Sequence, residues 1–232
     1  MMPDPAHLTA EGSRLEGGSF GEHLTSLGET EPNRTYQVML KAKELKSLSR
    51  HKITSMDRLE IRRFKEGDFD QYAEYHQNKD VYRYLYQDTP AEDALRANFS
   101  AAIDCKFSSD GDSANLAVIR KSDDAVVGEV ILKLSNISAL QGEVGYIFNP
   151  RFSGKGYATE AVRAIVDIGF DDVGFHRIFA RLDPKNRGSV GVVERLKFRR
   201  EAHLLQNDIF NGVWGDEYIY AILADEWRSH RG

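Results

Sequence analysis

The chain has 232 residues, 41% of them apolar, which is enough for one well-packed domain and an additional segment. Its formal net charge of −5 at pH 7 argues against a nucleic-acid partner, because such proteins present a basic surface. The single cysteine, Cys105, excludes an internal disulfide and favours a reducing, cytoplasmic setting. Neither a membrane-spanning apolar run nor a secretion signal is expected, so no membrane partner is predicted.

Residues 1–55 differ in composition from the rest of the chain. They contain scattered glycines and prolines and few large apolar residues, and no helical or strand period holds before Tyr36. One helix is predicted between Tyr36 and Leu48. We therefore expect residues 1–55 to form a disordered or partly helical extension, and residues 56–232 to form the folded domain.

The first part of the domain is predicted to be a strand followed by helices. Alternation from Leu59 predicts the strand, and Gly67-Asp68 begins a helix that runs to about Gln77. A short helical piece covers 79–85, and Thr89-Pro90 begins a longer helix that ends near 106. Three tyrosines cluster here, and they are interpreted either as core packing or as a wall for an acceptor substrate: Tyr82, Tyr84 and Tyr86.

The middle of the domain is predicted to be three successive strands and then a helix. Apolar runs at 116–119, 126–134 and 143–148 predict a meander, with a possible bulge at Gly128. From Ala158 to Gly169, apolar residues recur every three or four positions, which predicts an amphipathic helix. This helix acts as a crossover, so the strand at 175–182 should lie parallel to the strand at 143–148.

The last part is predicted to be a short helix and a hairpin. The helix covers 190–196, and strands at 198–209 and 214–223 flank Asn211-Gly212, a strong hairpin turn. The order of elements predicts a mixed α/β fold with helices on both faces of the sheet.

The segment between the third strand of the meander and the amphipathic helix carries the clearest chemical signal. It reads Asn149-Pro150-Arg151-Phe152-Ser153-Gly154-Lys155-Gly156-Tyr157-Ala158-Thr159-Glu160. A helix start presents unpaired N–H groups and the positive end of a dipole, and glycines let a ligand approach the backbone closely. Arg151 and Lys155 add positive charge, so the loop suits a pyrophosphate. The spacing matches neither a P-loop nor a dinucleotide-binding fingerprint, and the alternative is an ordinary strand-to-helix turn.

The pattern R-x-x-G-x-G-Y-A-T-E-A resembles the acetyl-coenzyme A loop of the GNAT (Gcn5-related) N-acetyltransferases, most of all the RimJ/RimL type that acetylates ribosomal-protein N-termini. The resemblance covers about residues 57–227. It extends to Asn186-Arg187-Gly188-Ser189, to Leu196-Lys197-Phe198 and to the closing strand that begins at Trp214. Lys197 stands where the family usually has glycine. The implied architecture is the GNAT fold, a mostly antiparallel mixed sheet.

The resemblance implies acetyl-CoA as co-substrate, no metal, and a primary amine as acceptor, either a protein or peptide N-terminus or a small-molecule amine. In the family, the strand before the loop splays from its neighbour and its amides face the thioester. Asn186 would hold the pantetheine arm, and Ser189 would lie near the sulfur. The cofactor-binding residues implied are Tyr146, Ile147, Phe148, Arg151, Phe152, Ser153, Gly154, Lys155, Gly156, Tyr157, Ala158, Asn186 and Ser189.

Two residues are candidates for catalysis. Glu143 begins the strand that leads into the loop, where it either takes the amine proton or is simply a solvated strand-end carboxylate. Ser189 either protonates the departing thiolate or caps the following helix. The leading hypothesis is an N-acetyltransferase that uses direct transfer in a ternary complex; the alternative is a non-catalytic acyl-CoA-binding or regulatory module. A homodimer remains open.

Overall fold

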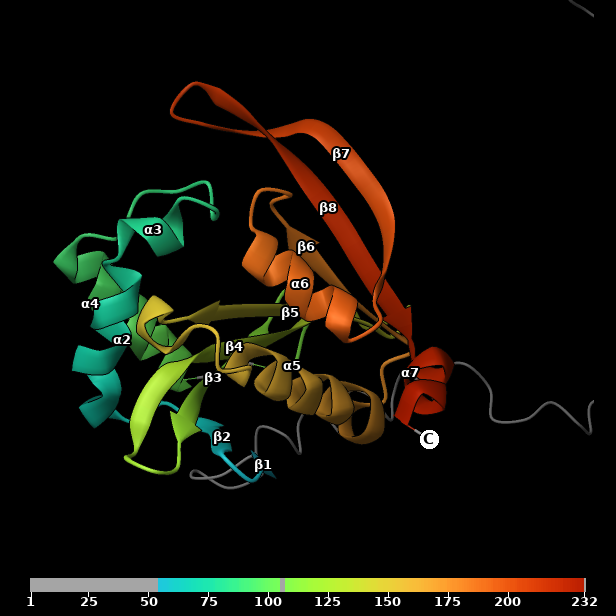
Figure 1. Cartoon of the computed structure of the whole chain (residues 1–232), viewed down its shortest axis with the longest axis horizontal. Coiled ribbons are helices and arrows are strands. Elements are labelled where there is room, and N and C mark those ends of the chain that lie inside the picture. The colour runs from blue at the N-terminus through green and yellow to red at the C-terminus, as the bar shows by residue number, and fades with distance from the viewer. Residues whose placement is uncertain (1–53, 105–106, 232) are drawn as a thin grey trace, which may run out of the picture. The chain divides into compact units, whose positions relative to one another are not determined.

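The described part of the chain is organised around one eight-stranded sheet, in the order β1-β2-β3-β4-β5-β6-β8-β7 (Figure 1). The computed structural model describes residues 54–104 and 107–231; Cys105 and the helix predicted between Tyr36 and Leu48 lie outside these ranges. The strands are β1 (Thr54–Ser55), β2 (Leu59–Arg63), β3 (Ser113–Arg120), β4 (Ala125–Asn136), β5 (Gln141–Phe148), β6 (Arg177–Leu182), β7 (Arg199–Phe210) and β8 (Val213–Leu223).

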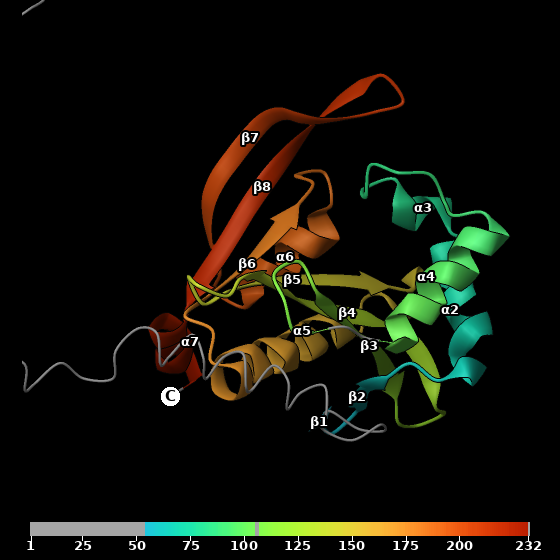
Figure 2. The same ribbon diagram turned by 180° about the vertical axis from the view of Figure 1, so that it is seen from behind.

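Helices cover both faces of this sheet (Figures 1 and 2). They are α2 (Phe69–His76), α3 (Lys79–Tyr82), α4 (Glu92–Asp104), α5 (Tyr157–Asp167), α6 (Arg187–Arg195) and α7 (Ala224–Arg231), with single turns η1 (Glu66–Asp68) and η2 (Pro150–Phe152) and a π-helical turn η3 (Ile168–Val173). None of the helices in the described ranges is long and apolar enough to cross a membrane.

The core consists of two apolar clusters, one on each face. The amphipathic face of α5 packs on the strands through fully buried side chains, including Val162 and Ile165, and η3, α6 and α7 extend this larger cluster. On the opposite face, Tyr72 and Tyr75 of α2 and Phe99 of α4 pack over β3 and β4. This burial of apolar surface on both faces fixes the register of the central strands.

The sheet separates at its middle. β5 and β6 are parallel and pair only over Gln141–Glu143 and Arg177–Phe179, whereas β4 pairs along all of β5 and β8 along all of β6. Beyond Glu143, one edge of β5 therefore has no strand partner among the described residues. Every second amide and carbonyl on that edge points into the opening between β5 and β6.

The predicted mixed, mostly antiparallel sheet is confirmed, and so are two local features. The register of β3 against β4 shifts beside Gly128, as the predicted bulge requires, and a Cβ at this position would lie 2.5 Å from the carbonyl oxygen of Ile147 on β5. Asn211 and Gly212 both have positive φ (49° and 75°), as a tight hairpin turn requires. Thr54 and Ser55, assigned to the extension from sequence, pair with β2. Helix α7 was not predicted.

Candidate functional site

The segment between β5 and α5 folds as a turn that is fixed from within. The Asn149 side-chain oxygen accepts a hydrogen bond from the Arg151 amide at 3.0 Å, and Pro150 begins η2. Gly154 and Gly156 then take left-handed backbone conformations, with φ of 75° and 80°, which glycine adopts without strain. α5 begins immediately afterwards at Tyr157, so the loop ends on a helix N-terminus.

The amides of this loop are available to a ligand. Among the described residues, no carbonyl accepts from the amides of residues 154–159; the first bond of the helix runs from the Glu160 amide to the Gly156 oxygen. A Cβ at Gly154 would meet open space, so a ligand has room beside the backbone. Free amides at the positive end of α5 form a site for an anion such as a pyrophosphate, so these residues fit the pyrophosphate of acetyl-CoA.

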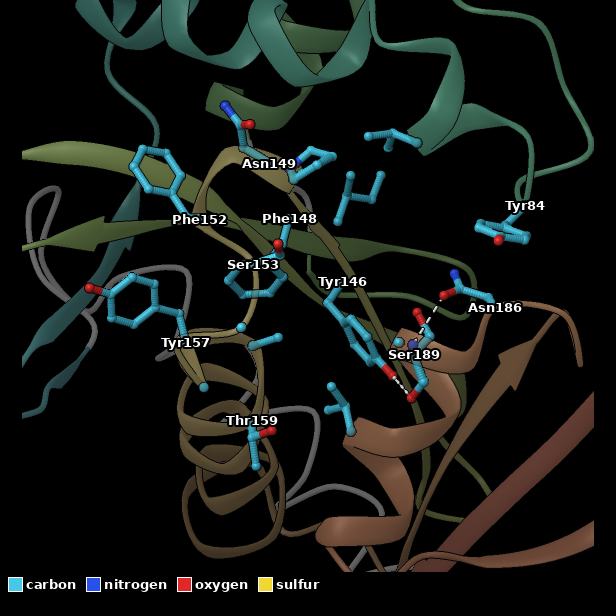
Figure 3. Close-up of a pocket in the computed structure, with 18 of the residues that line it drawn as sticks. Tyr84, Tyr146, Phe148, Asn149, Phe152, Ser153, Tyr157, Thr159, Asn186 and Ser189 are labelled. Carbon is cyan, nitrogen blue, oxygen red and sulfur yellow. Dashed lines mark hydrogen bonds between the residues drawn. The ribbon is translucent and has the colours of Figure 1, made fainter.

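A cleft of about 490 Å³ runs from this loop along the open edge of β5 to the start of α6 (Figure 3). Most of the residues expected to bind the cofactor line it. They are Tyr146, Ile147, Phe148, Phe152, Ser153, Gly154, Gly156, Tyr157, Ala158, Asn186 and Ser189. The structure thus brings together two motifs that lie about thirty residues apart in the sequence, the loop and the Asn-x-x-Ser segment.

Neither cation expected at the loop lines the cleft. The Arg151 side chain is exposed and lies 3.7 Å from the Glu74 carboxylate on α2. Lys155 is also exposed, and its backbone oxygen accepts a hydrogen bond from Arg58. Positive charge at the cleft comes instead from Arg195 of α6, whose Nε donates to the Thr159 hydroxyl at 3.2 Å.

Arg58, just before β2, holds the outer side of the loop. Its guanidinium donates to the Lys155 carbonyl at 3.0 Å and to the Glu160 carboxylate at 2.9 Å, and it lies 5.0 Å from the centre of the Tyr157 ring. It therefore contacts both the loop and the first turn of α5. Sequence reasoning missed Arg58 because it lies about a hundred positions from its partners.

The start of α6 differs from expectation in its cap. The helix begins at Arg187 rather than Val190, and Asn186 is the N-cap, its side-chain oxygen accepting from the Ser189 amide at 3.1 Å. Ser189 is therefore not the cap. Its carbonyl accepts a hydrogen bond from the Tyr146 hydroxyl at 2.8 Å, which links β5 to α6 across the opening (Figure 3). Burial raises the pKa of Tyr146, so this hydroxyl remains a donor at neutral pH.

Glu143 does not line the cleft. It is the last residue of β5 that pairs with β6, opposite Phe179, and it lies 3.7 Å from the Lys133 ammonium. Because side chains alternate along a strand, Glu143 points to the face opposite Tyr146. The structure therefore separates the two candidate catalytic residues, with Ser189 in the cleft and Glu143 at the apex of the opening on the other face.

The three clustered tyrosines take three different positions. Tyr82 is buried, and its hydroxyl lies 2.7 Å from Nδ1 of His76 on α2. Tyr84 lines the cleft and also a second cavity of about 460 Å³. Tyr86 lines only the second cavity, where its hydroxyl donates to the Asp183 carboxylate at 2.9 Å.

Tyr82 and His76 belong to a buried polar cluster. His76 has its Nε2 atom 3.5 Å from the Glu129 carboxylate, and the Tyr75 hydroxyl donates to that carboxylate at 3.2 Å. Burial, followed by the Glu129 charge, raises the pKa of Tyr82 to about 12. The cluster attaches α3 to α2 and β4. No group of three or more His, Cys, Asp or Glu side chains in residues 54–104 and 107–231 is arranged to hold a metal ion.

Comparisons with known proteins agree with this geometry. Residues 58–199 match the acetyltransferase (GNAT) domain. An uncharacterized N-acetyltransferase of Bacillus subtilis (strain 168), YnaD, is 32% identical over 171 residues, which are 73% of this chain and 96% of that protein.

Two solved structures share the fold. A GNAT-family acetyltransferase from Bacillus anthracis is 31% identical with a TM-score of 0.66, over 74% of this chain and 98% of that one. A spermidine N-acetyltransferase from Vibrio cholerae, solved with CoA and spermine, is 21% identical with a TM-score of 0.64, over 75% and 99%. From its matched domain and its relatives, the chain belongs to the GNAT acetyltransferase family and is an acyltransferase.

Proposed function

We propose that this enzyme transfers an acetyl group from acetyl-CoA to a primary amine by direct transfer in a ternary complex. The observation that carries the proposal is one continuous cleft, which joins the free amides of residues 154–159 to the opening between β5 and β6. An anion-binding loop and an exposed strand edge, joined in this way, suit a long ligand with a pyrophosphate at one end and a polar acyl group at the other.

Acetyl-CoA supplies an acetyl group that is activated as a thioester. The loop amides would hold its pyrophosphate, and Asn186 and the open edge of β5 would hold its pantetheine arm. The amides of residues 146–148 that point into the opening would donate to the carbonyl oxygen as it gains negative charge. All of these donors are backbone groups or a capping side chain fixed by the fold, so they are in place before the ligand arrives.

The transfer forms an N–C bond, breaks the C–S bond and releases one proton from the amine. Glu143 lies at the apex of the opening on the face opposite Tyr146, so it would accept that proton through water. The Ser189 hydroxyl, in the cleft, would donate to the departing thiolate. About a tenth of a free α-amine is neutral at pH 7, against roughly 0.04% of a lysine amine. An α-amine therefore depends less on the base.

We place the enzyme in the RimJ/RimL-type branch and infer that its acceptor is an α-amine, either at a protein or peptide N-terminus or on a small molecule. Support comes from the loop pattern that ends in Gly-Tyr-Ala-Thr-Glu-Ala and from the closing strand that contains Trp214.

The test is turnover on a panel of amines, with release of free thiol and the mass of the acetylated product as readouts. The full-length enzyme should release thiol only when an amine is present, and Ser189→Ala should lower kcat because the departing thiolate loses a hydrogen-bond donor. Binding of acetyl-CoA without turnover on any amine would contradict the proposal.

A further inference from the structure

The second cavity lies between the segment that follows α3 and the tip of the β7–β8 hairpin. Four aromatic rings line it: Tyr84, Tyr86, Phe210 and Trp214. Val213 and Trp214 are 63% and 55% exposed, which is unusual for apolar side chains of this size on a well-packed domain. Leu85, the neighbour of Tyr84 and Tyr86, is also exposed and lines the cleft. Apolar surface therefore extends from the cleft wall to the hairpin.

Tyr86 is locked into the wall of this cavity. Its backbone φ of 52° lies in the left-handed region, which is unfavourable for a tyrosine. Its hydroxyl donates to the Asp183 carboxylate at 2.9 Å, and the Asp216 carbonyl oxygen lies 3.3 Å from the same hydroxyl. The ring lies so close to Gly215 that a Cβ there would be 2.2 Å from it. The wall is thus formed before any ligand binds.

The charges at this cavity do not favour a second ammonium group. Asp183 is 9% exposed, and both its oxygens already accept hydrogen bonds, one from the Tyr86 hydroxyl and one from the Lys185 amide at 2.6 Å. The side chains of Arg83 and Lys185 bring positive charge to the same lining. Two further carboxylates, Asp208 and Asp216, act on Tyr86, and they already accept hydrogen bonds from the amides of Ile209 and Gln206. Aromatic walls with committed carboxylates suit an apolar group better than a polycation.

The second cavity adjoins the cleft. Tyr84 lines both, so one molecule with its amine at the opening between β5 and β6 has the remainder of its structure directed toward the second cavity. We propose that the acceptor is a primary amine that carries an aromatic ring, and that the ring binds among Tyr86, Phe210 and Trp214. This inference rests on the proposed function, because it assigns the acceptor of the same reaction.

The experiment compares kcat/KM for 2-phenylethylamine, Phe-Gly-Gly, Ala-Gly-Gly and spermidine in three full-length proteins. These are the wild type, Trp214→Ala and a control, Leu205→Ala, which removes a side chain that is 71% exposed on the same hairpin and outside the cavity. The wild type should prefer aromatic acceptors. Trp214→Ala should lower kcat/KM for them by about tenfold, through KM, as expected for the loss of aromatic packing. Leu205→Ala should match the wild type.

Comparison of 2-phenylethylamine with Phe-Gly-Gly tells whether the aromatic acceptor is a free amine or a peptide N-terminus. Preference for spermidine, or an equal effect of Trp214→Ala on all four acceptors, would overturn the inference and leave the acetyltransferase function intact. Thiol release on no acceptor, with acetyl-CoA bound, would overturn the proposed function and this inference together.

Discussion

The cleft and the second cavity adjoin, yet they are built in opposite ways. One run of the chain, residues 146–159, supplies most of the cleft, and its backbone amides are the groups offered to a ligand. The second cavity combines side chains from three separate segments, 83–86, 183–185 and 210–215. A site made of backbone leaves a contiguous motif of glycines and a helix start. A site made of side chains leaves none, so its ligand has to be inferred from the assembled walls.

The largest expected effect lies at Glu143, the last residue of β5 that pairs with β6. Glu143→Gln should lower kcat by about 100-fold, the low end for loss of a general base, with acetyl-CoA affinity little changed. Lys133→Gln is the matched control, because it removes the ion pair and keeps the carboxylate. Steady-state kinetics from pH 6 to 9 decide the outcome. If Glu143→Gln keeps the wild-type kcat across this range, Glu143 is not the general base. The rate would then depend mainly on how the backbone of the loop and of β5 positions the substrates.

The backbone character of the cleft is tested by Gly154→Val. The valine side chain would occupy the space beside the free amides, so acetyl-CoA binding should weaken at least tenfold, or about 1.4 kcal/mol. Gly111→Val is the control for strain, because Gly111 also has positive φ, 89°, and open space around it but lies outside the cleft. Titration calorimetry on both folded variants should separate them. Equal affinities would show that the loop does not hold the pyrophosphate.

A smaller effect is expected from substitution of Arg58, which contacts the outer side of the loop. Arg58→Gln leaves the Glu160 carboxylate unpaired in the first turn of α5, where it would repel a pyrophosphate. Because the Arg58 side chain is 52% exposed, KM for acetyl-CoA should rise only about two- to fivefold. Adding Glu160→Gln to this variant should restore most of the loss. A double variant as weak as Arg58→Gln would mean that Arg58 acts through the Lys155 carbonyl instead.

The buried Tyr82 hydroxyl should make the free energy of unfolding depend on pH in the alkaline range. The pKa of Tyr82 is raised to about 12 from an ordinary value near 10, so the folded state retains the phenolic proton longer than the unfolded chain. Its contribution is complete below pH 10 and is lost as pH rises toward 12. Tyr82→Phe should therefore lose less stability over this interval than the wild type in urea unfolding. An identical pH dependence in the two proteins would exclude Tyr82 as a contributor.

The smallest change is expected from removal of residues 1–53. A chain that starts at Thr54 keeps β1, which pairs Thr54 with Ile61 and Ser55 with Glu60. The residues that line the two cavities in the described part of the chain all lie beyond this start. Its kcat/KM should stay within about twofold of the full-length value, since no described contact of either site is lost. A folded but inactive protein would show that the extension takes part in the reaction.

Sequence alone predicted those parts of the molecule that depend on local periodicity. The burial pattern of α5, the meander and the Asn211-Gly212 turn follow from spacing and turn chemistry, and all three are present. Side-chain directions within an irregular segment do not follow. Tyr82 and Tyr86 are four residues apart, yet one faces the core and the other the second cavity, because the one-turn helix α3 ends between them.

Helix caps and contacts between residues distant in the chain likewise could not be predicted from the sequence. Asn186 and Ser189 are both residue types that cap helices, and only the observed hydrogen bond identifies Asn186 as the cap. Arg195 reaches the cleft because α6 packs beside α5. This packing places the Arg195 guanidinium near the Thr159 hydroxyl. The sequence around Ser189 and Arg195 carries no signal that distinguishes them from an ordinary surface serine and arginine.

The short parallel pairing between β5 and β6 has a consequence for motion. Three residue pairs join two half-sheets that are each held by long antiparallel ladders. A joint this short has fewer backbone hydrogen bonds to resist relative rotation of the halves than the ladders on either side. A ligand that contacts both β5 and the start of α6 suppresses this rotation and loses part of its binding free energy as entropy. Whichever substrate binds first carries that loss, and the second binds to a stiffer protein.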